Sequence, residues 1–256
     1  MGSALLRGWL AQGLAQRYLV VEPGPVPDAL RGHAEVAVLA APDQLPPEVA
    51  PAVIVLAVKP QAMAAVLPAY RRFAPAGTLF LSIAAGKTLG FFERMLGPAA
   101  VVRAMPNTPA AIGRGIAVAC ASALVAAPQR ALAERLLGAV GEVAWVADEA
   151  LLDPVTAVSG SGPAYVFLLI ECLAKAGMAA GLPEALALQL ARATVAGSGA
   201  LVALSGESAA ELREAVTSPG GTTRAALDVL MAGDGLETLL TRAVLAATQR
   251  SRELAD

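Results

Sequence analysis

The sequence has few of the residues that usually perform acid–base, redox or metal chemistry. It contains one histidine, His33, and two cysteines, Cys120 and Cys172, among 256 residues. One imidazole and two isolated thiols do not make a metal site of ordinary ligand spacing, so we expect no metal. The cysteines are far apart in apolar surroundings, which predicts reduced, buried and unreactive thiols. His33 is expected in a surface turn.

Aromatic residues and net charge are also scarce. Phe, Trp and Tyr make up 4 % of the chain and hydrophobic residues 56 %, so Ala, Val and Leu must fill the core. The formal net charge is −2 and no basic cluster occurs, which argues against a nucleic-acid partner. The first residues, from Met1 to Trp9, lack the basic segment, long apolar core and cleavage site of a secretion signal.

No uncharged run reaches the length of a membrane-spanning helix. The mean hydropathy is +0.61. The longest uncharged stretches, 154–170 and 115–129, are nevertheless shorter than the ~20 apolar residues that a span needs. Gly, Pro and Ser interrupt both of them. We therefore expect a soluble, cytoplasmic protein without a membrane partner.

What the sequence does contain is a change of hydrophobic period near residue 149. Before it, short β-branched runs alternate with helical segments, which indicates a mostly parallel sheet covered on both faces. Helices are predicted at 61–73, 88–96 and 128–140. The predicted strands are 18–21, 36–39, 53–58, 79–83, 101–104, 116–119 and 143–146.

The second half has no strand pattern. Its apolar residues recur at spacings of three and four, which indicates packed helices. Ser208 and Glu211 have the spacing of a capping box. We therefore predict a sheet domain over 1–149 and an all-helical domain over 150–256. The predicted helices are 167–180, 183–204, 208–216, 222–231 and 236–253.

Three predicted strands end in residues that suit a ligand at the carboxyl edge of a parallel sheet. Glu22 follows the first strand and suits an adenosine ribose, although a solvated turn residue is an equally ordinary interpretation. Lys59, in the segment Ala57-Val58-Lys59-Pro60, can reach a phosphate or a substrate, or can be a plain surface lysine. Asn107, after Met105-Pro106, can face a nicotinamide amide or simply form a turn.

The glycine loop that normally precedes the first helix of a dinucleotide site is missing from the sequence. Residues 2–12 have the pattern of the helix that follows such a loop, with Gly13 at its C-terminus and with Gly2 and Ser3 at its start. The strand before that loop is normally central, and its loss would leave two neighbours unpaired. We therefore expect roughly one more strand and turn, ~8–12 residues, upstream of Met1 in the natural gene product.

A second anion site is predicted late in the chain, at Ser218-Pro219-Gly220-Gly221-Thr222-Thr223. Glycines let the backbone fold tightly, and a helix that begins at Thr222 presents free amides and its positive dipole end. Such a helix start suits a carboxylate or a phosphate, with two hydroxyls beside it. The simpler interpretation is a capped turn between two helices of a bundle.

These segments resemble the pyrroline-5-carboxylate reductase family over nearly the whole chain. The most specific block is Leu212 to Leu230, centred on Val216-Thr217-Ser218-Pro219-Gly220-Gly221-Thr222-Thr223. It is supported by Met1-Gly2-Ser3-Ala4, by Ala57-Val58-Lys59-Pro60, by Met105-Pro106-Asn107-Thr108-Pro109 and by Ser159-Gly160-Ser161-Gly162-Pro163-Ala164-Tyr165.

The resemblance implies a doubly wound Rossmann-type domain followed by a helical dimerisation domain, and a reductase that uses NADPH or NADH. It implies cofactor contacts at Gly2, Ser3, Glu22, Ala57, Val58, Lys59, Pro60, Met105, Pro106 and Asn107. It implies that Ser218, Gly220, Gly221, Thr222 and Thr223 bind the substrate carboxylate, with the Thr223 hydroxyl directed to the ring nitrogen as the catalytic contact. It also implies an interlocked homodimer that often assembles further into a decamer.

Several alternatives remain open from the residues alone. A β-hydroxyacid dehydrogenase shares the two-domain plan, but it would need a lysine where Val166, Phe167 and Leu168 stand. A non-catalytic dimeric remnant with an impaired nucleotide site is another alternative. Ser159 to Pro163 suits close packing at least as well as substrate contact, and Glu207 suits a solvated cap. Glu22 favours NADH, whereas Arg31 can offset that preference.

Overall fold

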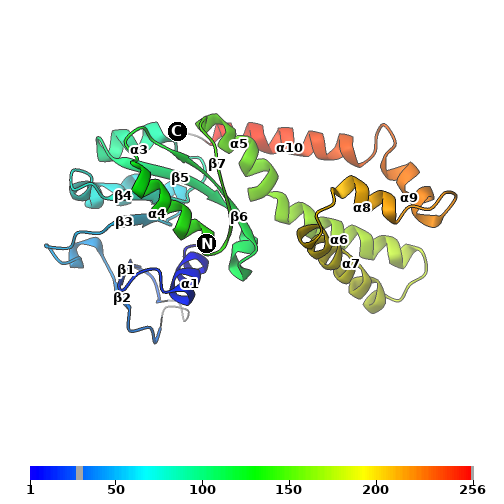
Figure 1. Cartoon of the computed structure of the whole chain (residues 1–256), viewed down its shortest axis with the longest axis horizontal. Helices are drawn as coiled ribbons and strands as arrows, with labels where there is room; N and C mark the ends of the chain where they lie inside the picture. The colour runs from blue at the N-terminus through cyan, green and yellow to red at the C-terminus, as the bar shows by residue number, and fades with distance from the viewer. Residues whose placement is uncertain (27–30, 255–256) are drawn as a thin grey trace. The chain divides into compact units, whose positions relative to one another are not determined.

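The structure is a computed structural model that describes residues 1–26 and 31–254. The chain divides into two compact units (Figure 1). The first contains Met1–Gly160 together with Ala247–Asp256, and the second contains Ser161–Ala246. The predicted fold class, an α/β domain and an all-helical one, is confirmed, whereas the predicted boundary at residue 149 stays a prediction.

All seven predicted strands are present in the first unit, in two sheets. The larger sheet has the order β3-β4-β5-β6-β7, and only the β5–β6 pair is antiparallel. The smaller sheet is the parallel pair β1-β2. The bounds are β1 Tyr18–Val21, β2 Val36–Leu39, β3 Val53–Leu56, β4 Leu79–Ser82, β5 Ala100–Pro106, β6 Gly115–Ala121 and β7 Gly141–Trp145.

The strands form two sheets, with the open edges that the sequence predicts for two strands whose common neighbour is missing. β1 pairs only with β2, and β3 pairs only with β4, so each of them has one open edge within the described residues. Both sheets nevertheless contribute to one core, because Val20 of β1 and Val55 of β3 pack against the same buried cluster as Leu5 and Trp9. The expectation of an additional strand upstream of Met1 stays a prediction.

The helices of the first unit cover this sheet. Phe80, Phe92 and Leu67 are fully buried in a second cluster, and the Trp9 indole donates a hydrogen bond to the Leu136 carbonyl at 2.7 Å. The helices are α1 Gly2–Gln12, α2 Met63–Val66, α3 Leu89–Leu96, α4 Ala127–Gly138 and α5 Leu152–Val155. The short 3₁₀ and π segments are η2 Pro42–Gln44, η3 Pro60–Ala62, η4 Leu67–Phe73, η5 Thr108–Ile112, η6 Glu149–Leu151 and the π-helix η7 Thr156–Gly160.

One predicted helix of this unit is broken. The segment 61–73 forms η3, α2 and η4 in succession rather than one α-helix. Pro68 lies at the start of η4 and has no amide hydrogen for an α-helical bond, and its ring would crowd the preceding turn. The 3₁₀ geometry accommodates it.

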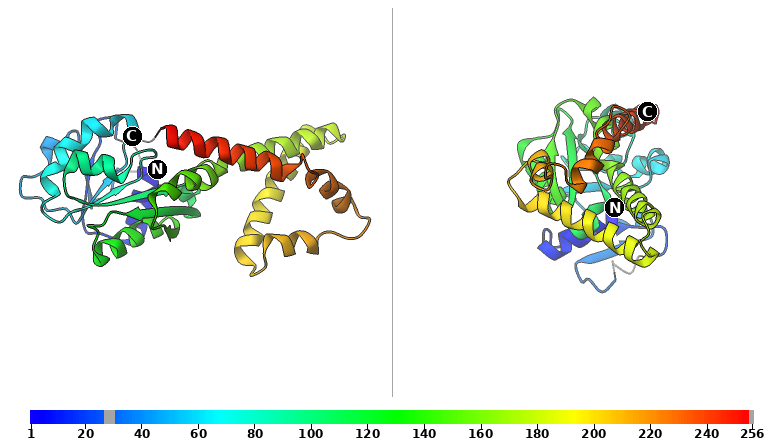
Figure 2. Two further views of the ribbon diagram at one scale, coloured as in Figure 1. Left: turned by 90° about the horizontal axis from the view of Figure 1, so that it is seen from above. Right: turned by 90° about the vertical axis from the view of Figure 1, so that its right-hand side faces the viewer.

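The five helices predicted for the second half are present. α6 and α7 pack against each other, as both views in Figure 2 show. α6 begins at Gly162, five residues before the predicted start, and α10 ends with residues from Ala247 onward that belong to the first unit. The bounds are α6 Gly162–Ala179, α7 Glu184–Leu204, α8 Ala209–Ala215, α9 Thr222–Leu230 and α10 Leu236–Glu253.

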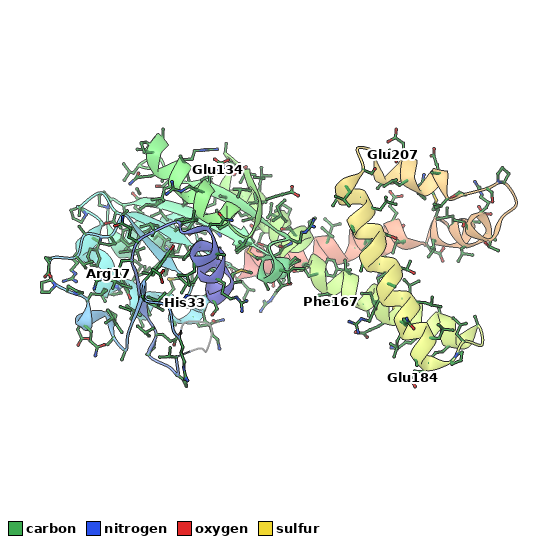
Figure 3. The ribbon with its side chains drawn as sticks, turned by 60° about the horizontal axis from the view of Figure 1, so that its bottom comes forward. Arg17, His33, Glu134, Phe167, Glu184 and Glu207 are labelled. Carbon is green, nitrogen blue, oxygen red and sulfur yellow. The ribbon has the colours of Figure 1, made fainter. Side chains whose placement is uncertain are left out.

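Helix α6 leaves much apolar surface uncovered. Phe167 is 59 % exposed, and Figure 3 shows its side chain on the outside of the ribbon. Val166, Leu168, Leu169 and Leu173 are also exposed. Cys172 lies on the same helix and is exposed, so the prediction that both cysteines are buried is wrong for Cys172 and confirmed for Cys120. The apolar residues around Cys172 are therefore only partly packed within this chain, since Leu169 and Leu173 are exposed whereas Ala174 is buried.

Two helical segments are long and apolar enough to cross a membrane, judged by length and composition. They are Glu149–Ala179 and Glu184–Leu204, with 11 % of each apolar window buried in the chain. These segments are longer than the uncharged runs of the sequence, because each segment includes a few charged residues, such as Glu171 or Arg192. The absence of a membrane partner stays a prediction.

Candidate functional site

The amino terminus of α1 has the features of a phosphate site. The Met1 carbonyl accepts hydrogen bonds from the Ala4 and Leu5 amides at 2.9 and 3.1 Å, so within the described residues the amides of Gly2 and Ser3 have no partner. Two free amides at the positive end of a helix attract an anion. A side chain at Gly2 would come within 3.0 Å of the Ala57 Cβ, so this helix start lies against the end of β3.

The segment after β3 adds a cation at that edge. Ala57 and Lys59 are exposed and Val58 and Pro60 are half-buried. The Lys59 carbonyl accepts a hydrogen bond from the Ala62 amide at 2.9 Å, and η3 begins there. In the described part of the chain the Lys59 ammonium makes no ion pair, so it is available to a ligand. The structure therefore brings Gly2, Ala57 and Lys59 into one neighbourhood, as the sequence predicts.

The end of β5 is arranged differently from the expectation. The Asn107 Oδ1 accepts the Ile116 amide at 3.0 Å and so anchors the start of β6. The structural role of Asn107 is therefore observed, and its NH₂ group remains available to donate to a ligand. Met105 packs against Gly160, because a Cβ there would lie 2.5 Å from the Met105 Cε. Gly160 thus has the close-packing role, and Pro106 is buried.

Glu22 lies where the sequence predicts it, directly after β1. Its Oε1 accepts the Gly24 amide at 3.0 Å, which fixes the carboxylate at the end of the strand. The Arg31 guanidinium donates to the Val26 carbonyl at 3.4 Å. His33 is exposed in the turn before β2, as predicted and as Figure 3 shows. It is not part of any of these groups.

The segment that follows β4 is a part of this edge that was not predicted. β4 lies between β3 and β5, so its carboxyl end borders the two strand ends that carry Lys59 and Asn107. Ser82 is buried there, and the loop 83–88 contains Gly86 with a φ of 75°. The sequence contains small residues, Ala84-Ala85-Gly86, directly after a predicted strand. Their place in the site follows only from the strand order, which the sequence does not show.

The 218–223 loop lies in the second unit and forms the predicted helix start. Gly220 has a φ of 69°, in the left-handed region that favours glycine. The Gly221 amide donates to the Ser218 carbonyl at 3.1 Å, and the Ala225 amide donates to the Gly221 carbonyl at 3.2 Å. The predicted donor Gly221 is therefore already paired.

Three successive amides at the start of α9 have no partner within residues 1–26 and 31–254. They belong to Thr222, Thr223 and Arg224, so the free amides begin after Gly221 and include Arg224, which was not among the predicted substrate-binding residues. Thr223 is half-buried and Thr222 is exposed. A Cβ at Gly221 would lie 2.5 Å from the Ser218 Oγ, so glycine is required for Ser218 to fold over this turn. Glu207 is exposed before α8 and far along the chain from these amides (Figure 3).

A cavity of about 310 Å³ lies beside this loop, between residues of α8 and α9. Its charges are mostly compensated, since the Arg224 Nε lies 2.8 Å from the Asp228 Oδ1 and the Arg213 Nη2 lies 3.4 Å from the Glu214 Oε1. The lining residues are Arg213, Glu214, Thr217, Arg224, Leu227, Asp228 and Met231. In the described ranges no group of three or more His, Cys, Asp or Glu side chains is placed to hold a metal ion.

A mostly parallel sheet with a helix start and a cation at its carboxyl edge, in a chain that also contains an all-helical unit, is typical of the nicotinamide-dinucleotide-dependent oxidoreductases. Residues 149–254 match the family model for pyrroline-5-carboxylate reductase dimerisation. The pyrroline-5-carboxylate reductase of Pseudomonas aeruginosa is 47 % identical over 205 residues, which cover 80 % of this chain and 75 % of that protein. The chain belongs to the pyrroline-5-carboxylate reductase family.

Solved structures agree over the whole chain. A pyrroline-5-carboxylate reductase from Coxiella burnetii has a TM-score of 0.90 at 34 % identity, and the match covers 99 % of this chain and 94 % of that one. The Plasmodium falciparum pyrroline carboxylate reductase, crystallised with NADP bound, has a TM-score of 0.84 at 28 % identity, covering 100 % and 95 %. Neither the hydroxyacid dehydrogenase nor the non-catalytic alternative is favoured by these relatives.

Proposed function

We propose that two groups of residues in this chain carry out the family's reaction, the reduction of 1-pyrroline-5-carboxylate to L-proline with NAD(P)H. One group is the carboxyl edge of the sheet, and the other is the 218–223 loop with the start of α9. The single observation that carries the substrate assignment is the run of three unpartnered amides at Thr222, Thr223 and Arg224. Such a helix start binds small anions, including a carboxylate.

The residues of the first unit fit a dinucleotide. Gly2 is so close to Ala57 that any side chain would fill the space between them, and the free amides of Gly2 and Ser3 would hold the pyrophosphate. Lys59 would neutralise phosphate charge, and the NH₂ group of Asn107 would donate to the nicotinamide amide. The Plasmodium falciparum relative binds NADP. When bound, the cofactor supplies the hydride.

The chain's own residues orient the imine and stabilise its charge. A cyclic imine arrives protonated at moderate pH, so no strong side-chain acid is required. This agrees with a sequence whose one histidine lies in an exposed turn. In the proposal the substrate carboxylate accepts hydrogen bonds from the α9 amides, and the Thr223 hydroxyl orients the ring nitrogen. The rate gain then comes from positioning and electrostatics.

We extend the proposal to assembly and location. The helical unit would form a homodimer, with a decamer as the larger assembly, and the protein would act in the cytoplasm with a small-molecule substrate and without nucleic acid or membrane partners. Support comes from the match to the dimerisation model and from the exposed apolar side chains of α6.

Thr223 provides the test of this function. Thr223→Ala is expected to lower kcat roughly 10- to 100-fold, the effect of losing one hydrogen bond to a charged group, with unchanged circular dichroism. Thr223→Ser keeps the hydroxyl and should recover most of the activity. The measurement is the oxidation of NADH or NADPH with pyrroline-5-carboxylate, followed by absorbance. Unchanged turnover in Thr223→Ala would remove this hydroxyl from the reaction.

A further inference from the structure

The last turn of α10 is not a frayed end. Thr248 and Ser251 are only 6 % and 8 % exposed, and they lie three residues apart on one face of the helix. The Leu254 amide still donates to the Arg250 carbonyl at 3.2 Å, so the helical bonding continues to the end of the described chain. This turn belongs to the first unit, and Figure 1 marks the C-terminus near α3 and α5.

A hydrogen bond between residues 98 positions apart holds the turn in place. The Ser251 Oγ donates to the Asp153 Oδ1 at 2.7 Å. Asp153 is half-buried in α5, which leads directly into the π-helix η7. Because the acceptor is a carboxylate and the donor is buried, this bond is of the stronger, charge-assisted kind.

The end of the turn is pressed against the loop that follows β4. A Cβ on Gly86 would lie 2.8 Å from the Leu254 carbonyl oxygen, and Gly86 has a φ of 75°. The backbones of Gly86 and Leu254 therefore approach as closely as they do because residue 86 is glycine. The conformation of the 83–88 loop is coupled to the position of the C-terminal turn.

That loop lies at the edge where the dinucleotide would bind, since β4 is the strand between β3 and β5. We infer that Ser251 and Asp153 are positioning residues for the cofactor: they hold the last turn of α10, and the turn fixes the 83–88 loop beside Lys59 and Asn107. The inference rests on the proposed function. Neither residue is among those that the proposed function assigns to cofactor binding.

The test compares cofactor binding with turnover in the full chain. Ser251→Ala is expected to raise the Kd for NADPH, followed by its fluorescence, and the KM for NADPH roughly three- to tenfold, the range that loss of one hydrogen bond gives. The kcat should change less than twofold. Ser251→Thr should restore the wild-type Kd, and Arg252→Ala, an exposed change on the same turn, should leave it unaltered.

A double mutant separates coupling from general weakening. Ser251→Ala combined with Asp153→Ala should bind NADPH no worse than the weaker single variant, because both changes remove the same bond. The inference would be overturned if the losses of NADPH affinity in the two single variants added in the double variant, or if both single variants kept the wild-type Kd. In either case, turnover by the wild-type protein would still support the reductase function. A wild-type protein that binds neither cofactor would overturn both.

A folding failure does not leave the question open. If Ser251→Ala loses the native circular dichroism spectrum, Asp153→Asn decides, because the amide keeps an acceptor of the same shape without the charge. An NADPH Kd between the wild-type value and a tenfold increase then supports the positioning role. A Kd equal to that of the wild type contradicts it.

Discussion

Cys120 is surrounded by groups that act on its thiol in opposite directions. Burial raises the pKa of Cys120, the Glu149 carboxylate raises it further, and the Arg103 guanidinium lowers it in part. Glu149 is held by an ion pair with Arg103 and by the Leu89 amide, whose nitrogen lies 2.6 Å from its Oε1. The carboxylate therefore stays close to the thiol.

From this environment we predict an unreactive thiol at neutral pH. A raised pKa leaves less thiolate, and the 2 % exposure of Cys120 blocks access. In a Cys172→Ser variant, iodoacetamide at pH 8 should modify Cys120 at least roughly tenfold more slowly than after denaturation in urea. Equal rates in the two states would show that the site opens freely.

Glu22 allows a prediction about the choice of cofactor. Its carboxylate is held at the end of β1 by the Gly24 amide, where a 2′-phosphate would meet a negative charge. Glu22→Gln should raise kcat/KM for NADPH relative to NADH by about fivefold, as expected for one partly screened charge. Glu35→Gln, which removes an exposed carboxylate before β2, is the matched control. An identical ratio in wild type and Glu22→Gln would mean that residue 22 does not face the ribose.

For single residues, the sequence predicted where the candidate binding residues lie better than it predicted which hydrogen bonds they make. Glu22 directly follows β1, which ends at the predicted residue Val21, whereas β3 ends at Leu56, two residues before the predicted end, and Lys59 lies in the segment that follows it. The amide oxygen of Asn107 and the amide of Gly221 are already paired within the chain. Such pairings depend on Ile116 and on the path of the turn, and neither follows from residue type.

Among the elements, α8 has an N-terminus that the sequence defines well. The Glu211 amide donates to the Ser208 Oγ at 3.2 Å, and the Ser208 amide donates to the Glu211 carboxylate at 2.7 Å, which forms the predicted capping box. The Ser208 amide and hydroxyl bonds hold the pKa of Glu211 below its usual range.

Ser208→Ala should therefore destabilise the protein by about 1 kcal/mol at pH 7, the ordinary value of a lost cap. Because the folded pKa of Glu211 is lowered, its contribution is present above the unfolded glutamate pKa and is lost as the pH falls through the folded value. Thermal unfolding should show a smaller effect of Ser208→Ala at pH 3 than at pH 7. Ser198→Ala, an exposed change inside α7, should leave stability nearly unaltered at both pH values.

The wrong prediction of one continuous helix over 61–73 could have been avoided. Pro60 and Pro68 are visible in the sequence, and proline inside an α-helix removes a hydrogen bond. The open edges of β1 and β3 correspond to the two unpaired neighbours that the sequence predicts when a central strand is missing. The antiparallel pairing of β5 with β6 was not predictable, because the direction of a strand pair depends on long-range contacts that the local sequence does not encode.

For the whole molecule, the order of an α/β unit and a helical unit followed directly from the change in hydrophobic period. The pattern did not show that α6 exposes apolar residues and Cys172. A spacing of three and four identifies an apolar helix face, but it does not tell whether the same chain covers that face. An exposed apolar surface of this kind is typical of an interface.

Phe167 is the sharpest probe of that interface. If a second copy covers α6, Phe167→Asp places a charge in an apolar contact and should shift the assembly toward a 25.8 kDa monomer in light scattering after gel filtration. Ile112→Asp is the matched control, since Ile112 is 78 % exposed, more than Phe167, but lies in the first unit. Its assembly should equal that of the wild type.

The segments that contain α6 and α7 are long and apolar enough to cross a membrane. The same experiment therefore also distinguishes a dimer interface from a membrane-spanning segment. A reductase that assembles through α6 should be recovered in buffer without detergent, and Phe167→Asp should remain in solution as a smaller particle. A membrane-inserted α6 would instead require detergent for the wild type, and a charge near the middle of the span would cost about 3 kcal/mol of insertion. Wild-type protein found only in the membrane fraction would contradict the homodimer.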